Sequence, residues 1–150
     1  MLQHIQIGKM CIEHIDDVMV VEKLCFRIPW SREAFIEEVT GNKFACYLSA
    51  LVNNRVVGYA GMWKVCDEGH ITNIAVHPDF RGSGIGSLLL EKLMEIAKSD
   101  GISSMTLEVR KSNLVAQALY NKYGFEIAGS RKRYYADNNE DALIMWKNHL

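Results

Sequence analysis

The sequence predicts an α/β protein of the α+β type, with a mixed, mostly antiparallel sheet flanked by helices. Strand-like runs cluster in the first half of the chain and alternate with helices in the second, in an order of about β-αα-βββ-α-β-α-ββ. The chain has 150 residues, of which 49% are hydrophobic and 23% charged. This length and composition predict a single globular domain over residues 1–150.

The first third of the chain predicts a strand and then a helix. The strand is expected over residues 4–12. Asp16 or Asp17 is a suitable N-cap for the helix, which runs to about Phe26. Its apolar positions recur at helical spacing. They are Val18, Val21, Leu24 and Cys25.

A second short helix is expected after Pro29, which interrupts the first one. Ser31 is its predicted N-cap, and it ends near Gly41. Phe35 and Val39 face inward in this prediction.

Three strands are predicted next, over residues 45–52, 56–64 and 70–76. The first two are separated by Asn53, Asn54 and Arg55, a turn of hairpin length.

A strongly amphipathic helix is expected over residues 85–99, with Gly101 as its stop. Its apolar stripe comprises Leu89, Leu93, Ile96 and Ala97. The remaining elements are a strand over 104–110, a helix from the Asn113 cap to about Lys122, and closing strands over 125–130 and 142–147.

A glycine-rich turn, Arg81-Gly82-Ser83-Gly84-Ile85-Gly86, lies between a strand and the long helix. Backbone N–H groups of such a turn and of the helix N-terminus can bind a phosphate, and Arg81 can add charge. A flexible turn explains the glycines equally well. The spacing excludes a P-loop, which needs a lysine after its last glycine, and a dinucleotide fingerprint, which needs glycine where Ser87 stands.

Three motifs in order resemble the GCN5-related N-acetyltransferases. They are Arg81-x-x-Gly84-x-Gly86 after the strand that ends at residues 73–78, Asn113, and Ala116-x-x-Leu119-Tyr120-x-x-x-Gly124-Phe125. The resemblance implies that family's fold and acetyl-CoA as cosubstrate. It implies cofactor contacts from Ile74, Ala75, Val76, Arg81, Gly82, Ser83, Gly84, Ile85, Gly86 and Asn113. The strand residues would act through backbone groups, as a sheet edge does for an added strand.

Within the family, the likeness is strongest to the branch that acetylates the N-terminal alanine of a small-subunit ribosomal protein. Residues 22–31, 107–113 and 131–142 carry it. It implies a protein N-terminus as partner. Acetylation of a lysine side chain or a small amine, and acyl-CoA binding without catalysis, are the alternative functions.

Glu108 is the candidate base, because it interrupts the otherwise apolar run Met105-Thr106-Leu107-Glu108-Val109. A charge buried in such a strand is costly unless it is paired or functional. The position of Glu108 therefore indicates a carboxylate that is either functional or paired. The alternative is a strand-edge carboxylate paired with Arg110 or Lys111. The family resemblance favours the base, because this position matches the family's proton acceptor.

Tyr120 is the candidate acid, since a phenol can protonate a departing thiolate. Its spacing with Ala116, Leu119 and Tyr123 fits an ordinary core residue better. The resemblance to the family's proton donor reverses that preference.

Trp30, Tyr134 and Tyr135 are candidates for lining the acceptor site, with partly exposed structural aromatics as the equal alternative. The basic run Arg131, Lys132 and Arg133 is typical of a solvated edge.

The cysteines, the histidines and the net charge indicate which metals and partners to expect. The four cysteines lie in apolar runs without a CxxC pair, and the five histidines show no ligand spacing. We therefore expect no metal. A net charge of -1 predicts no direct binding of nucleic acid or membrane. A cytoplasmic protein, monomeric or weakly dimeric, is expected.

Overall fold

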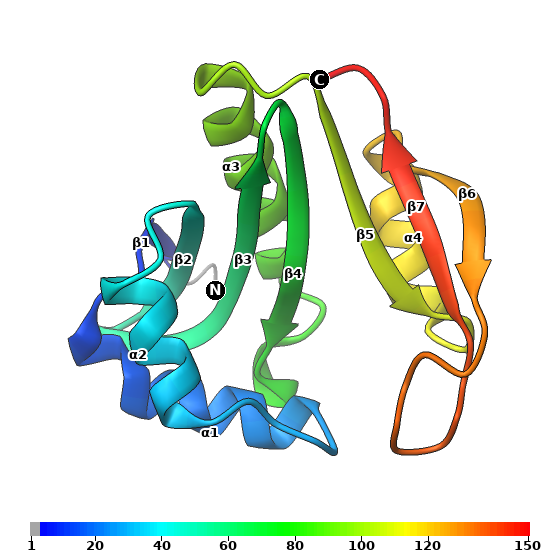
Figure 1. The fold of residues 1–150 in the computed structure, drawn as a ribbon. Helices are drawn as coiled ribbons and strands as arrows, with labels where there is room; N and C mark the ends of the chain where they lie inside the picture. Colours follow the sequence, from blue (N-terminus) through cyan, green and yellow to red (C-terminus); the bar gives the residue numbers. More distant parts are fainter. Residues whose placement is uncertain (1–3) are drawn as a thin grey trace.

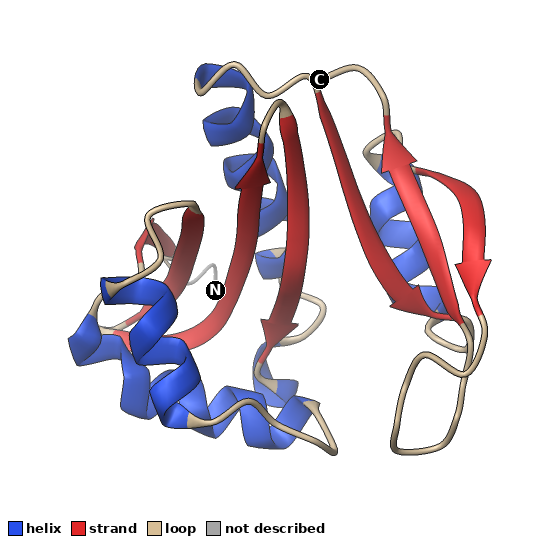
Figure 2. Ribbon diagram, viewed as in Figure 1, coloured by secondary structure: helices blue, strands red, loops and turns tan. Residues whose placement is uncertain are grey.

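The computed structural model describes residues 4–150, and its centre is one seven-stranded sheet with the order β1-β2-β3-β4-β5-β7-β6 (Figures 1 and 2). The strands are β1 (Gln6–Lys9), β2 (Ala45–Val52), β3 (Arg55–Val65), β4 (Glu68–Val76), β5 (Ser104–Arg110), β6 (Glu126–Arg131) and β7 (Ala142–Lys147). The α-helices are α1 (Ile15–Cys25), α2 (Arg32–Thr40), α3 (Ile85–Ser99) and α4 (Leu114–Lys122). Two short 3₁₀ helices, η1 (Ile12–His14) and η2 (Pro78–Phe80), complete the described chain.

The sheet is antiparallel at every junction but one, which confirms the predicted fold class. The exception is the β4–β5 junction, where α3 provides the crossover that a parallel pair requires. Pairing there covers only Glu68, Gly69 and His70 on β4 against Ser104, Met105 and Thr106 on β5. Beyond these residues the two strands diverge, as Figure 1 shows, and they leave a wedge in the sheet.

Helices cover the sheet on both faces, and each face has its own core. On one face, α1 and α2 pack over β2, β3 and β4, with Val18, Val21, Phe35 and Tyr59 in the interior. On the other, α3 and α4 pack with Leu89, Leu93, Tyr120 and Phe125 among the buried side chains. The helices α1 and α2 lie over the half of the sheet before the wedge, so the first face of β5 stays uncovered (Figure 1).

The turn and helix caps that were predicted from sequence are formed by local backbone conformations and hydrogen bonds. The β2–β3 hairpin turns at Asn53 and Asn54, whose φ angles of 52° and 63° fit the left-handed conformation that asparagine tolerates. Ser31 caps α2 by accepting a hydrogen bond from the amide of Ala34, and Asn113 caps α4 through the amide of Ala116.

Four local predictions need correction. The first strand ends at Lys9, because η1 follows it. The N-cap of α1 is His14, and the predicted caps Asp16 and Asp17 lie inside the first turn. The carboxylate of Asp17 instead accepts a hydrogen bond of 3.0 Å from the amide of Val56.

Leu24 is 53% exposed, and Glu22 occupies the buried face in its place. Val18, Val21 and Cys25 define a narrow stripe along α1, and Leu24 lies outside that stripe. Cys66 is exposed in the β3–β4 turn and does not lie in an apolar run.

No helix within residues 4–150 is long and apolar enough to cross a bilayer. The predicted domain also includes residues 1–3, which lie outside the described residues.

Candidate active site

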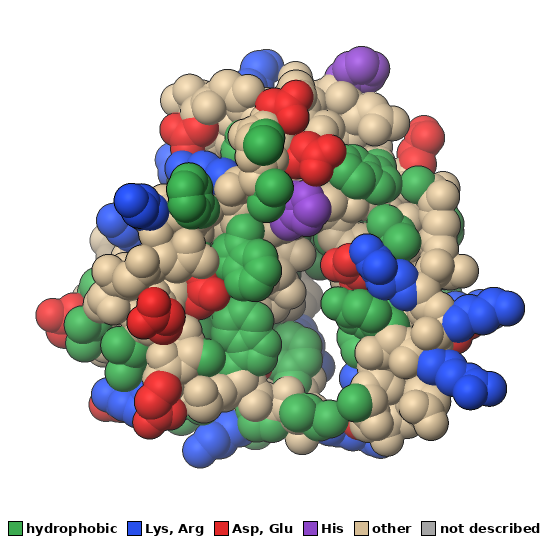
Figure 3. All heavy atoms as spheres, in the orientation of Figure 1, with side chains coloured by type: hydrophobic (Ala, Val, Ile, Leu, Met, Phe, Trp, Pro, Cys, Tyr) green, Lys and Arg blue, Asp and Glu red, His purple; other side chains and the backbone are tan. Residues whose placement is uncertain are grey.

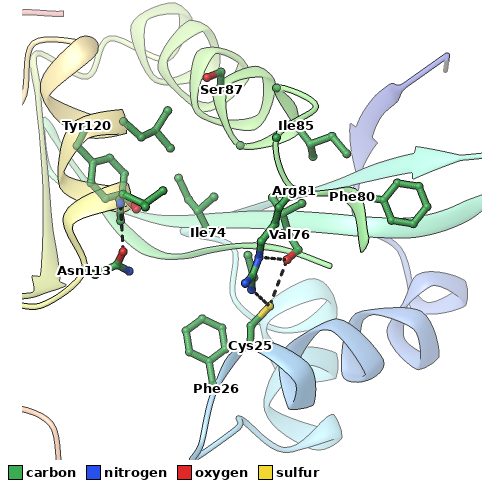
Figure 4. A pocket seen from close by; sticks show the side chains of 17 residues that line it. Cys25, Phe26, Ile74, Val76, Phe80, Arg81, Ile85, Ser87, Asn113 and Tyr120 are labelled. Atoms are coloured by element: carbon green, nitrogen blue, oxygen red, sulfur yellow. Dashed lines mark hydrogen bonds between the residues drawn. The ribbon is translucent and has the colours of Figure 1, made fainter. Parts of the chain in front are cut away.

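A pocket of about 640 Å³ opens in the wedge where β4 leaves β5 (Figure 4). Its floor is the last part of β4, and Ile74, Ala75 and Val76 line it as predicted. These residues pair with β3 on one side and have left β5 on the other. The free edge of β4 can therefore pair with an extended ligand as an added strand would.

The glycine-rich turn forms one end of the pocket, directly before α3. Gly82 and Gly84 have φ angles of 79° and 85°, a conformation that favours glycine. A Cβ at either position would meet no atom within 4 Å, so the turn is open. Ile85, Gly86 and Ser87 open α3 with amides that have no partner within the helix. The geometry is suited to a phosphate group.

Arg81 crosses the mouth of this turn. Its Nε donates to the carbonyl oxygen of Val76 at 3.2 Å, and its Nη2 contacts the Sγ of Cys25 at 3.4 Å. Figure 4 shows the three groups meeting at the pocket wall. An exposed guanidinium therefore lies at the same end of the pocket as the glycine-rich turn.

The opposite wall comes from α4. Asn113 lines the pocket while it caps this helix, so the two predicted roles are compatible. Ala116, Leu119 and Tyr120 follow along the same face of α4. Gly86 lies on the other side, and a Cβ there would be 3.6 Å from Leu119. A Cβ at position 86 would therefore make an ordinary van der Waals contact, so the approach of α3 to α4 does not require a glycine there.

Tyr120 is 7% exposed and lies against Phe125, with 5.9 Å between ring centroids. Tyr120 belongs to the core, as its spacing indicates, and it also lines the pocket. Burial raises the pKa of Tyr120 above its usual value near 10, and the neighbouring Tyr135 raises it further. The phenol is thus protonated at neutral pH, as an acid must be.

Glu108 is partly exposed and paired, but with another partner than the two residues considered from sequence. The side chain keeps 33% of its exposure, and its Oε1 lies 3.4 Å from Nε of Arg131. The partner is on β6, so neither Arg110 nor Lys111 forms the predicted pair. Glu108 points to the uncovered face of β5, opposite the buried Leu107 and Val109. It is not part of the pocket lining.

Tyr134 and Tyr135 lie in the loop between β6 and β7, with their rings 5.1 Å apart. Burial raises the pKa of Tyr135 to about 12, opposed by the charge of Arg110. The negative charge of Glu108 also contributes to the rise in the pKa of Tyr135.

Trp30 is placed elsewhere, in an aromatic cluster with Phe35 and Tyr47 at centroid distances of 5.4 and 6.5 Å. Its backbone amide donates to Oε2 of the buried Glu22 at 2.8 Å. The hydroxyl of Tyr59 donates to the other oxygen of Glu22. Burial raises the pKa of Glu22, although these two hydrogen bonds oppose the rise.

Ser83 is the one predicted cofactor residue outside the pocket lining, and its hydroxyl donates to the carbonyl of Phe80. Further lining residues were not predicted as site residues. They are Cys25, Phe26, Phe80, Ser87, Val115, Ala116 and Leu119. Ala116 and Leu119 stood in the motif, whereas Cys25 and Phe26 arrive from α1 by tertiary packing that carries no local signal.

The space-filling view shows a hollow between the α1–α2 half of the molecule and the β5–β7 half, bordered by hydrophobic side chains (Figure 3). One face of the wedge therefore offers a second approach, opposite the face that α3 and α4 cover. In residues 4–150, no group of three or more His, Cys, Asp or Glu side chains is arranged to hold a metal ion.

The features of this pocket suit an extended ligand that carries a phosphate group. An open glycine turn and a helix N-terminus suit a pyrophosphate, and the free edge of β4 suits an extended pantetheine. Tyr120 lines the same pocket from α4.

Comparison with known proteins supports this interpretation. Residues 15–125 match the model of the acetyltransferase (GNAT) family. A relative from Bacillus subtilis (strain 168) is 42% identical over 140 residues, 93% of each chain, and carries a provisional name as a ribosomal protein bS18-alanine N-acetyltransferase.

Two solved structures extend the comparison. The ribosomal-protein-S18-alanine N-acetyltransferase from Escherichia coli is 32% identical, with a TM-score of 0.87 over 95% of this chain and 92% of its own. The PaiA N-acetyltransferase from Thermoplasma acidophilum, solved in complex with coenzyme A, shares the fold at 20% identity, with a TM-score of 0.84 over 97% and 99% of the two chains. The chain therefore belongs to the GNAT family and is an acetyl-CoA-dependent N-acetyltransferase.

Proposed function

We propose that this enzyme acetylates the N-terminal α-amino group of a small-subunit ribosomal protein that begins with alanine. The observation that carries the proposal is the whole-chain likeness to a structure named for this activity, 32% identical over 95% of the chain. The pocket supports it, because one end suits a pyrophosphate and the other presents Tyr120.

The acceptor amine must lose a proton, since an ammonium has no lone pair. An α-amino group has a pKa near 8, against about 10.4 for a lysine side chain. At pH 7 about a tenth of the α-amino groups are neutral, but under about 0.1% of lysines are. A modest base is therefore enough for an N-terminal acceptor.

In this proposal Glu108 accepts the amine proton, directly or through one water. Its exposed position suits the task, because the proton can pass on to solvent. The nitrogen forms a bond to the acetyl carbon and the carbon–sulfur bond breaks. Tyr120 donates its proton to the departing sulfur and is restored from solvent.

The cofactor side is assigned to the residues of the pocket. Arg81 and the amides of Gly82 to Gly86 would hold the pyrophosphate, and the edge of β4 at Ile74 to Val76 would hold the pantetheine. Asn113 would contact the same ligand from the start of α4. Acetyl-CoA supplies the activated acetyl group as a thioester.

The acceptor side is assigned to Tyr134 and Tyr135, whose rings contact each other in the loop between β6 and β7. Trp30 packs on Phe35 and is not assigned to this side. A single domain thus serves both substrates. We propose a cytoplasmic enzyme that meets its substrate as a protein N-terminus, without a metal.

The decisive experiment offers the protein acetyl-CoA and two matched peptides. One begins with a free N-terminal alanine and contains no lysine, and the other has a blocked N-terminus and one internal lysine. Mass gain is expected on the first peptide only, between pH 7 and 9. Transfer to the second peptide would mean that the acceptor is a lysine side chain and not an N-terminal amine. If calorimetry shows coenzyme A binding but no amine is acetylated, the protein is an acyl-CoA-binding module without catalytic activity.

A further inference from the structure

We propose that Arg110 is a positioning residue for the acceptor: it fastens the loop of residues 132–141 and, through it, holds Tyr135 beside the reacting groups. The inference rests on the proposed function, because it takes Tyr135 as part of the acceptor site. Arg110 is the last residue of β5 and follows Glu108 by two positions, so the two side chains lie on the same face.

The guanidinium of Arg110 bonds to three side chains of this loop. Its Nη2 lies 2.9 Å from Oδ2 of Asp137, and its Nη1 lies 3.3 Å from Oε1 of Glu140 and 3.2 Å from Oδ1 of Asn138. A planar guanidinium can serve several acceptors at once, which an ammonium on a flexible stem does less well. These bonds tie the loop between β6 and β7 to the end of β5.

The same guanidinium lies over the ring of Tyr135, with Cζ 4.0 Å from the ring centroid. Contact at this distance is a cation–π interaction. It fixes the ring against the end of β5, the strand that also carries Glu108 two positions before Arg110. Arg110 therefore touches the loop's acidic side chains and its acceptor-site aromatic together.

The loop completes its own fold around these contacts. The amide of Tyr135 donates to the carbonyl of Glu140 at 3.2 Å, and the amide of Asn139 donates to the carbonyl of Tyr135 at 2.8 Å. Oε2 of Glu140 accepts from the amide of Ser112 at 2.6 Å, at the point where β5 ends. The position of Tyr135 is thus set by these bonds within the loop, together with the contacts of Arg110 to the loop side chains and to the ring itself.

The charges show why the loop depends on this arginine. Asp137 is 9% exposed and its Oδ1 is buried without a hydrogen-bond partner, while Glu140 is 16% exposed. Two poorly solvated carboxylates sharing one cation repel each other once that cation is removed. Loss of Arg110 is therefore expected to release the loop rather than let it settle in place.

The test compares Arg110→Met and Arg110→Lys with Lys111→Met, which removes the neighbouring positive charge from an exposed site. Steady-state kinetics are measured for the alanine peptide and for acetyl-CoA separately. We expect Arg110→Met to lower kcat/KM for the peptide roughly tenfold or more, since misplaced binding groups cost this much. KM for acetyl-CoA should stay within about twofold, because Arg110 is outside the cofactor pocket. Arg110→Lys should recover part of the loss, and Lys111→Met should resemble the unmodified enzyme.

A double-mutant cycle with Tyr135→Leu tests whether Arg110 acts through this ring. In the Tyr135→Leu background, Arg110→Met should have a much smaller effect on peptide kcat/KM than it has alone. Equal effects in both backgrounds would overturn the proposal, as would parallel losses for peptide and acetyl-CoA.

Hydrogen exchange of residues 132–141 gives a readout that needs no substrate. Arg110→Met should speed exchange in this loop and leave β3 and β4 unchanged, whereas unchanged exchange in the loop would overturn the proposal. If the unmodified enzyme ignores the alanine peptide, the proposed function fails. The exchange result still decides whether Arg110 orders the loop, and the cycle is then run with the amine that is accepted.

Discussion

Nε of Arg131 lies 3.4 Å from Oε1 of Glu108, and the pair bridges the strands on either side of β7. Both side chains are substantially exposed, at 56% and 33%. An ion pair in such a setting contributes about 0–1 kcal/mol to stability. The stability of the fold therefore depends very little on the Glu108 carboxylate, which is available to act as a general base.

Glu108→Gln is expected to lower kcat by about 100-fold or more, the usual contribution of a general base. The binding of coenzyme A by calorimetry and the midpoint of thermal unfolding should stay close to those of the unmodified enzyme. Arg131→Gln is the matched control, because it breaks the same ion pair and keeps the carboxylate. A similar loss of kcat in both variants would mean that the pair matters and that Glu108 is not the base.

Tyr120→Phe is expected to lower kcat at least about tenfold while coenzyme A affinity is kept. The raised pKa of Tyr120 favours its neutral form, so raising the pH from 7 to 9 should not reduce the acid's protonation or produce a falling alkaline limb. Tyr123→Phe removes a hydroxyl from the end of the same helix, one that donates to Glu91 at 2.7 Å outside the pocket. Full activity of Tyr120→Phe would exclude this residue as the acid.

Gly84→Ala tests whether the glycine-rich turn binds coenzyme A, and Gly101→Ala is the matched control. Both glycines have positive φ, 85° and 80°, and neither has an atom within 4 Å of an added Cβ. Each substitution should cost about 1 kcal/mol of folding free energy, because an alanine is strained in this conformation. The two positions lie beyond opposite ends of α3, a helix of 15 residues that is about 22 Å long. Only Gly84→Ala should weaken coenzyme A binding, and equal affinities would remove the turn from the cofactor site.

Local signals explain which features were predicted from sequence. The bounds of α3 follow from a strong apolar period that begins after glycines and ends at Gly101. The cap at Asn113 follows from the hydrogen bond that its side chain can offer to the amide of Ala116. Each of these features depends on neighbours within a few residues, so the sequence carries it directly.

Features that depend on distant packing were missed. Glu108 sits between buried neighbours in sequence, yet it is exposed because α1 and α2 cover only the strands on the other side of the wedge. Cys25 reaches the cofactor pocket only because α1 crosses the end of β4, where its Sγ donates to the carbonyl of Val76. The cluster around Arg110 joins residues that are 27 to 30 positions apart.

Glu22, the buried carboxyl that the helical pattern did not reveal, should give the protein an unusual pH dependence. Burial raises its folded pKa above the value of about 4.3 expected in the unfolded chain. The folded state therefore binds the proton more tightly, and the stabilising contribution is fully present below about pH 4.3. It is lost as the pH rises through the folded pKa.

Glu22→Gln cannot titrate, so the free energy of unfolding of the unmodified protein minus that of Glu22→Gln should fall as the pH rises from 4 toward 8. Urea unfolding of both proteins across this range measures the difference. A flat difference for Glu22→Gln would mean that the hydrogen bonds from Tyr59 and Trp30 fully offset the cost of burial.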